Sequence, residues 1–208
     1  MNTNRTIHRV AGTEQQQAEE YRYWQSLTVG ARLSAVWDVS AAAYAFAAAF
    51  NGVPLNDSRR PQELLRAFND HGVKYLIVGG YAFGVHAEPR ATKDLDIFIR
   101  SDEQNAEALF RALAQYGAPL VDLTPADFMD GSTFQIGQPP ARIDILQHID
   151  GVTFDEAWEN RIEGLIESEI QAAVISRSDL IRNKLATGRE QDILDAKKLR
   201  SASKNDPK

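Results

Sequence analysis

Two short apolar segments, joined through a glycine pair and an aspartate pair, constrain the fold of this chain more than any other feature. Residues 74–78 (KYLIV) lead into Gly79-Gly80 and then into a stretch expected to begin a helix. A second apolar run, residues 95–99, is entered through Asp94 and Asp96. Because side chains alternate between the faces of a strand, these two carboxylates are expected to point the same way, a few ångströms apart.

The aspartate pair predicts a metal site. Carboxylates held together at a strand end repel each other unless a cation lies between them. Ligands that offer only oxygen suit a hard divalent ion, and Mg²⁺ is the ion expected. The alternative is that Asp94 and Asp96 are acids on a strand edge that discourage pairing with another chain. The strand is too apolar for that role, which favours the metal site.

Asp144 is the candidate third carboxylate. It lies in the strand-like run 142–146, between Ile143 and Ile145, so its side chain is expected on the opposite face from theirs and on the same face as that of Arg142. A third acid would let two Mg²⁺ ions share ligands, one at the attacking hydroxyl and one at the triphosphate. The alternative is a solvent-facing aspartate on a half-exposed strand.

Gly79 and Gly80 are candidates for binding phosphate. A glycine pair lets the backbone approach a ligand closely, and the N-terminus of the following helix favours negative charge. A tight strand-to-helix turn is the alternative. The sequence matches neither the dinucleotide-binding glycine pattern nor the P-loop.

These motifs resemble a known family. A Gly-Gly after one strand and an Asp-Leu-Asp in the next resemble the signature of the nucleotidyltransferase superfamily typified by DNA polymerase beta. The longer pattern GGYAFGVHAEPRATKDLDIFI, followed by LIRNKLATGREQDILDAKKL, is similar to bacterial AbiEii-type nucleotidyltransferases, many of them toxins of toxin–antitoxin pairs. The resemblance covers about residues 61–200. It implies transfer of a nucleoside monophosphate from an NTP to a tRNA end or a protein hydroxyl, in a toxin–antitoxin or phage-defence setting.

The resemblance also implies further site residues. Arg90 and Thr92 belong to the R-x-T-x-D-x-D run, where Arg90 either positions phosphates and the aspartates or simply pairs with Asp94 or Asp96. The run K-x-A-x-x-R-x-x-D-x-x-D implies a second cluster, with its lysine holding the triphosphate; a salt-bridged surface helix is the alternative. The members of this cluster are Lys184, Arg189, Asp192 and Asp195.

Composition excludes several classes of site. The chain has 208 residues and no cysteine, so disulfides, thiolate metal sites and cysteine nucleophiles are excluded. For the same reason His86-Ala-Glu88 is not a zinc deaminase motif, which needs a downstream cysteine pair. The net charge of −6 argues against general nucleic-acid binding. Basic residues near the C-terminus are compatible with either a solvated helix or a surface facing polyphosphate or RNA.

The chain is expected to divide into a flexible leader (residues 1–17), a helical N-terminal arm (18–50), a linker (51–60), the nucleotidyltransferase domain (61–200) and a disordered tail (201–208). The arm should break into two helices near residues 26–30, with Thr28 capping the second. Either it packs on the domain as part of the core, or it is a regulatory arm that binds an antitoxin-like partner or a second copy. The apolar run 41–50 is shorter than the about 20 residues that span a bilayer, so a cytoplasmic protein without membrane contact is expected.

Within the domain, periodicity predicts helices at residues 62–70, 102–116, 155–165, 178–186 and 190–200. Strands are predicted at residues 74–78, 95–99, 133–136, 142–146 and 170–175. Helices and strands do not alternate regularly, which favours an α+β fold; the resemblance implies the small mixed sheet of polymerase-beta-like enzymes. Two other functions stay open: a nucleotidyltransferase that modifies an antibiotic or other small molecule, and a non-catalytic nucleotide-binding or antitoxin-like module.

Overall fold

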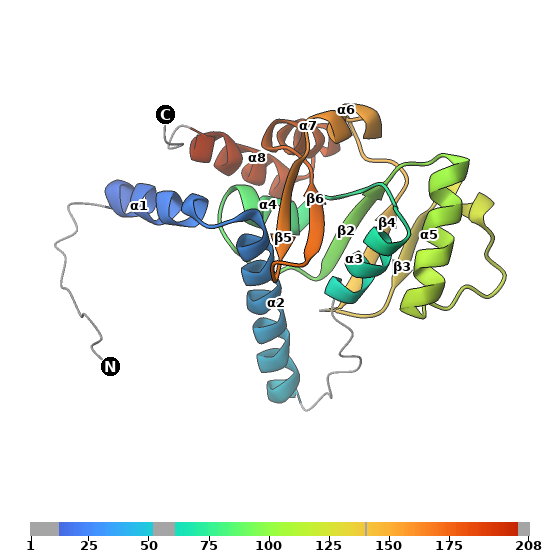
Figure 1. Ribbon diagram of the computed structural model, residues 1–208. Coiled ribbons are helices and arrows are strands. Elements are labelled where there is room, and N and C mark those ends of the chain that lie inside the picture. The colour runs from blue at the N-terminus through green and yellow to red at the C-terminus, as the bar shows by residue number, and fades with distance from the viewer. Residues whose placement is uncertain (1–12, 52–60, 140, 204–208) are drawn as a thin grey trace.

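The computed structural model describes residues 13–51, 61–139 and 141–203. In these residues, six strands form one mixed sheet in the order β3-β4-β2-β1-β6-β5, with helices packed around it (Figure 1). The strands are β1 (Tyr75–Ile77), β2 (Asp94–Ile99), β3 (Thr133–Ile136), β4 (Arg142–Leu146), β5 (Ile162–Ile166) and β6 (Ile170–Val174). The helices are α1 (Thr13–Ser26), α2 (Val29–Asn51), α3 (Pro61–Asp70), α4 (Gly79–His86), α5 (Glu103–Tyr116), α6 (Phe154–Glu159), α7 (Arg177–Thr187), α8 (Glu190–Ser203) and the 3-10 helix η1 (Pro125–Met129).

The sheet confirms the predicted α+β class. β2 pairs antiparallel with β1 and parallel with β4, while the predicted strands β3 and β4 pair antiparallel with each other. β6 lies parallel to β1 and antiparallel to β5. The central strand β1 is buried along its whole length, which explains its continuous apolar sequence. β1 and β2 therefore lie in the middle of the sheet, with their glycine and aspartate ends adjacent.

Local sequence signals account for most helix ends. Asp102 caps α5 by accepting a hydrogen bond from the amide of Asn105. Thr28 caps α2 in the same way, since its Oγ1 accepts from the amide of Ala31 at 3.2 Å. Gly72, with φ of +68°, follows the end of α3.

The predicted helix over residues 155–165 is wrong in its second half. Helix α6 ends at Glu159, and residues 162–166 form β5, which pairs antiparallel with β6. Trp158, Ile162 and Leu165 are spaced as on a helix, which is why periodicity misleads here. Pairing with β6 determines the observed conformation, and the hairpin turn lies at Glu167 and Ser168, both with positive φ.

The N-terminal helices pack on the domain. A Cβ on Gly30 of α2 would lie 1.8 Å from the carbonyl oxygen of Leu165, so α2 contacts β5 backbone to backbone. Trp24 of α1 is buried and donates its indole N–H to the carbonyl of Gly84 at 2.8 Å. Arg32 of α2 donates to the carbonyl of Val85 at 2.7 Å. Both helices are thus attached to α4, the helix that follows the glycine pair.

Several of the expected domain boundaries differ from the observed helix ends or lie outside the described residues. α1 begins at Thr13, within the expected leader, and α8 continues to Ser203, past the expected start of the tail. Residues 1–12, most of the expected linker (52–60) and residues 204–208 lie outside the described residues.

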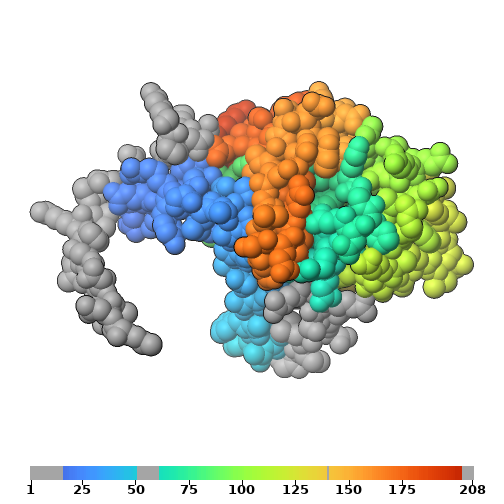
Figure 2. Space-filling model, viewed as in Figure 1, coloured from blue at the N-terminus to red at the C-terminus, as the bar shows by residue number. Residues whose placement is uncertain are grey.

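The outer half of α2 extends away from the domain (Figures 1 and 2). Phe46 and Phe50 are 76% and 83% exposed. By length and composition, Val29–Phe50 is the one helix in the described residues long and apolar enough to cross a membrane, so the length argument made from residues 41–50 alone was too narrow. A single helix of this kind is weak evidence for a membrane protein, and here its first half packs on α4 and β5.

Substituting Gly84→Ala should loosen the contact between α2 and α4. The new Cβ would lie 2.3 Å from Cγ2 of Val36, so one of the helices must shift. We expect the free energy of unfolding, measured by urea titration, to fall by about 1–3 kcal/mol. In a Val36→Ala background the same substitution should cost much less; an equal cost in both backgrounds would contradict the contact.

Candidate active site

The glycine pair forms a close contact with the aspartate strand. Gly79, with φ of +58°, turns the chain from β1 into α4, and a Cβ there would lie 1.9 Å from Oδ2 of Asp96. A Cβ on Gly80 would lie 2.5 Å from Oγ1 of Thr92. Val78, the N-cap residue of α4, makes no side-chain capping hydrogen bond. Only glycine fits these positions, and the N-terminus of α4 opens directly beside the carboxylates.

Three carboxylates lie together on two neighbouring strands. Asp96 of β2 stands opposite Asp144 of β4 in the parallel pair, and Asp94 stands opposite Arg142. Leu95 between the two β2 aspartates is buried on the other face, in agreement with the predicted alternation. The structure therefore brings together the three acids that the sequence singled out.

Burial and the neighbouring acids raise the pKa of two of these aspartates. Burial, followed by the negative charges of Asp94 and Asp144, raises the pKa of Asp96 to about 7. The amide of Gly80 and the charge of Lys184 act in the opposite direction. Burial also raises the pKa of Asp144. The positive charge of Arg142 acts to lower it, and the negative charge of Asp94 acts to raise it. The cluster therefore carries a charge repulsion that a cation would relieve.

Arg142 supplies a counter-charge within the cluster. Its guanidinium forms an ion pair with Asp94, and its Nε lies 3.1 Å from Oδ1 of Asp144. Gln135 of β3 donates to the other oxygen of Asp144 at 3.3 Å. From the sequence, Arg142 is only a neighbour that shares a strand face with Asp144. That i, i+2 spacing was the available signal for its place in the site.

Lys184 and Asp195 form the centre of a second, buried network. Lys184 Nζ lies 2.6 Å from Asp192 and 2.9 Å from Asp195. Arg90 donates two hydrogen bonds to Asp195, of 2.6 and 2.7 Å, so the interpretation of Arg90 as the partner of Asp94 or Asp96 is wrong. Lys184 and Asp195 are only 5% and 0% exposed, so the alternative of a salt-bridged surface helix is wrong as well.

The charges of this network are balanced. Burial raises the pKa of Asp195, but hydrogen bonds from Arg90 and Lys184 outweigh it and lower the pKa below its ordinary value. Thr187 donates to the free oxygen of Asp192 at 2.8 Å. Because the charge of Lys184 also acts on Asp96, the network lies next to the carboxylate cluster. It joins α7, α8 and the segment that enters β2.

Arg189 is a predicted site residue that does not join the carboxylate cluster or the Lys184 network. It is exposed at the junction of α7 and α8, and its side chain forms no hydrogen bond or ion pair with any described residue. A role for Arg189 in nucleotide binding stays a prediction.

Thr92 links the site to helix α2, and this link could not be predicted from the sequence. The Thr92 amide donates to Oγ of Ser40 at 3.0 Å. Tyr44 lies one turn further along α2. Burial, and then the negative charge of Asp94, raise the pKa of its hydroxyl. Nothing in the sequence marked Ser40 or Tyr44 as residues near the site, because both lie in an alanine-rich helical run.

Asp94, Asp96 and Asp144 are the residues that could hold a metal ion. Their oxygen-only chemistry suits Mg²⁺ or Mn²⁺. Across the described ranges, no group of three or more His, Cys, Asp or Glu side chains is already arranged as a metal site. Arg142, paired with Asp94 and Asp144, now occupies the position of the counter-ion, so a metal would have to replace it.

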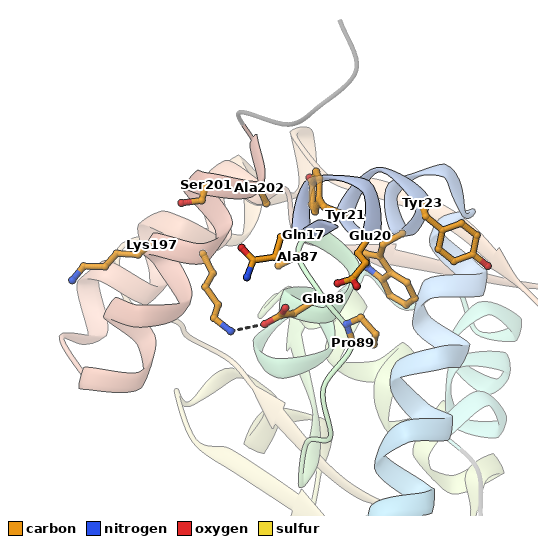
Figure 3. A pocket seen from close by; sticks show the side chains of 12 residues that line it. Gln17, Glu20, Tyr21, Tyr23, Ala87, Glu88, Pro89, Lys197, Ser201 and Ala202 are labelled. Atoms are coloured by element: carbon orange, nitrogen blue, oxygen red, sulfur yellow. Dashed lines mark hydrogen bonds and ion pairs between the residues drawn. The ribbon is translucent and has the colours of Figure 1, made fainter. Parts of the chain in front are cut away.

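A separate pocket of about 720 Å³ lies between α1, residues 87–89 and α8 (Figure 3). Glu88 and Lys198 form an ion pair at its edge, while Lys197 points away from it. None of the residues that line it belongs to the carboxylate cluster or to the Lys184 network. The chemistry therefore lies elsewhere.

Substituting Asp96→Asn should alter how stability depends on pH. The pKa of Asp96 is about 7 in the folded protein against an ordinary 3.8, so the folded state holds the proton more tightly and stability falls as pH rises between these values. In EDTA, wild-type unfolding free energy should fall by a few kcal/mol more than that of the variant between about pH 4 and about pH 8. Urea titrations test this, with exposed Glu107→Gln as control; parallel curves for wild type and Asp96→Asn would contradict it.

Substituting Asp195→Asn should destabilise the fold strongly. The change leaves buried Lys184 and half-buried Arg90 with too little negative charge, so the free energy of unfolding should fall by about 3–5 kcal/mol. Exposed Glu190→Gln, on the same helix, is the matched control and should change it by less than about 0.5 kcal/mol. Equal effects in thermal or urea unfolding would show that the buried network does not hold α8.

Comparison with known proteins agrees with this geometry. The family described as "Nucleotidyltransferase of unknown function (DUF6036)" matches residues 61–203, which span every strand of the sheet, the carboxylate cluster and the Lys184 network. No curated protein matches the chain. Since the match covers more than half of the sequence, the chain belongs to this family of nucleotidyltransferases.

Proposed function

We propose that this protein is a divalent-metal-dependent enzyme that transfers a nucleoside monophosphate from an NTP to an acceptor hydroxyl. The observation that carries the proposal is the set of three carboxylates, Asp94, Asp96 and Asp144, beside the N-terminus of α4. The raised pKa values of Asp96 and Asp144 mean that these two acids favour either protons or a cation. At neutral pH a divalent ion is the stronger partner.

In this proposal the three aspartates would hold one or two Mg²⁺ ions, and Arg142 would give up its ion pairs with Asp94 and Asp144. The ion would neutralise phosphate charge and favour ionisation of the acceptor hydroxyl. The amide groups at Gly79 and Gly80 bind phosphate oxygens, aided by the helix dipole of α4. The acceptor hydroxyl would lose its proton to Asp144 or to solvent water, and its oxygen would bond to the α-phosphorus. The bond from that phosphorus to the oxygen bridging the α- and β-phosphates would break, and pyrophosphate would leave.

Lys184 is proposed to support the triphosphate side of the site. It already pairs with Asp192 and Asp195, and its charge reaches Asp96. A buried lysine held by two carboxylates is fixed in place, which suits electrostatic stabilisation of a transferring phosphoryl group. Arg90 contributes by holding Asp195 rather than by direct contact with the catalytic acids.

The resemblance of both motifs to AbiEii-type enzymes supports a tRNA end or a protein hydroxyl as acceptor, and a toxin–antitoxin or phage-defence setting in the cytoplasm. A small-molecule acceptor is the alternative. Binding of an antitoxin-like partner, or self-association through the N-terminal helices, stays a prediction.

The direct test is incubation with Mg²⁺, total bacterial tRNA and each α-³²P-labelled NTP in turn. We expect label on RNA or on protein, and a loss of at least about 10³-fold in the Asp94→Ala/Asp96→Ala variant, because both proposed metal ligands are removed. The Glu107→Gln variant should label as the wild type does. Labelling that survives in EDTA or in the double variant would overturn the metal-dependent mechanism; NTP binding without label on any macromolecule would favour a small-molecule acceptor.

A further inference from the structure

Helix α2 lies outside the region matched by the family, yet it makes a direct hydrogen bond to the active site. Ser40 is fully buried, and its hydroxyl donates to the carbonyl of Val36 in its own helix at 2.8 Å. The same oxygen accepts from the amide of Thr92 at 3.0 Å. A buried serine with both hydrogen bonds made has a defined orientation, so it fixes the position of Thr92.

Thr92 is in contact with both halves of the site. Its Oγ1 lies 3.4 Å from Oδ1 of Asp94 and is the atom that a Cβ on Gly80 would meet at 2.5 Å. Any movement of Thr92 therefore changes the space beside the glycine turn and the surroundings of the Asp94 carboxylate. A shift of about 1 Å at a catalytic group is enough to cost a large factor in rate.

The segment that carries Thr92 has few other supports. Between the end of α4 and the start of β2, residues 87–93 form no regular structure, and Glu88, Pro89, Ala91 and Lys93 are exposed. Arg90 fixes the middle of this segment through Asp195, and Ser40 fixes its end at Thr92. Tyr44, one turn beyond Ser40, lies on the same side of α2. There burial, and then the charges of Asp94 and Arg142, affect the pKa of its hydroxyl.

We propose that α2 is a working part of the nucleotidyltransferase site and that Ser40 is a positioning residue, which holds Thr92 and through it the Asp94 carboxylate. The proposal rests on the proposed function. It assigns a role in the reaction to a segment that the family match does not include.

Three variants test this inference in the full-length chain. Ser40→Ala removes the acceptor, and Ser40→Cys replaces it with a weak acceptor of similar size. Ser34→Ala, a half-buried serine on the same helix, is the matched control. We expect both Ser40 variants to lower kcat by about 10- to 100-fold with little change in KM for the NTP, since positioning is lost while ground-state binding remains. Ser34→Ala should behave as the wild type.

A second measurement does not depend on turnover. Calorimetry should show weaker Mn²⁺ binding by both Ser40 variants than by Ser34→Ala, because Asp94 is less well placed. The samples compared contain the same fraction of folded protein. If the wild type binds Mn²⁺ but transfers no nucleotide, the proposed function fails while the Ser40 comparison still stands. If the Ser40 variants match Ser34→Ala in Mn²⁺ affinity, and in kcat where there is turnover, the positioning role is overturned. Lower stability of Ser40→Ala alone does not support it, because a purely structural serine would give the same result.

Discussion

Charge repulsion among three aspartates on two adjacent strands is the constraint around which this structure is organised. Strand pairing places Asp96 directly opposite Asp144, and the side-chain alternation of β2 adds Asp94 on the same face. Such an arrangement costs free energy unless positive charge is near. Arg142 supplies that charge from the same strand as Asp144, and the N-terminus of α4 adds a partial positive charge from the adjoining turn.

The buried network of Lys184 keeps the rest of the domain in place around these acids. Its two cations and two carboxylates balance, so the pairs are buried without a net charge. The network also links segments far apart in the sequence, because Arg90 precedes β2 whereas Asp195 lies on the last helix. Helices α7 and α8 are therefore held against the entry to β2 by oriented polar contacts in addition to apolar packing.

Much of the fold and of the site could be predicted from the sequence. Strands β3, β4 and β6, helix α5 and the shared face of Asp94 and Asp96 all follow from short-range patterns: alternation, capping residues and turn residues. Alternation also gave the face of Asp144, but its place beside the other two acids depends on the pairing of β2 with β4. The partner of Arg90, the counter-charge role of Arg142 and strand β5 could not be predicted in this way. Each depends on a contact between distant segments, and a periodic pattern carries no information about which segments meet.

Helix α2 gave the largest gap between sequence and structure. Its alanine-rich composition predicts a helix, but nothing in the run shows that Ser40 contacts Thr92 or that Gly30 lies against the backbone of Leu165. Close backbone approach between helix and strand needs glycine at both surfaces, and Gly164 of β5 supplies the second. This complementarity becomes visible only when the two elements are placed side by side.

The exposed end of α2 gives the molecule a mechanical property. An α-helix is a stiff rod, and about 15 Å of it separates Ser40 from Phe50. Phe50 is in solvent, whereas Ser40 is buried and holds the segment that enters β2. Ser40 lies between Phe50 and the contact of Gly30 with β5, so displacing the outer end about that contact would move Ser40 together with the Thr92 amide that it binds.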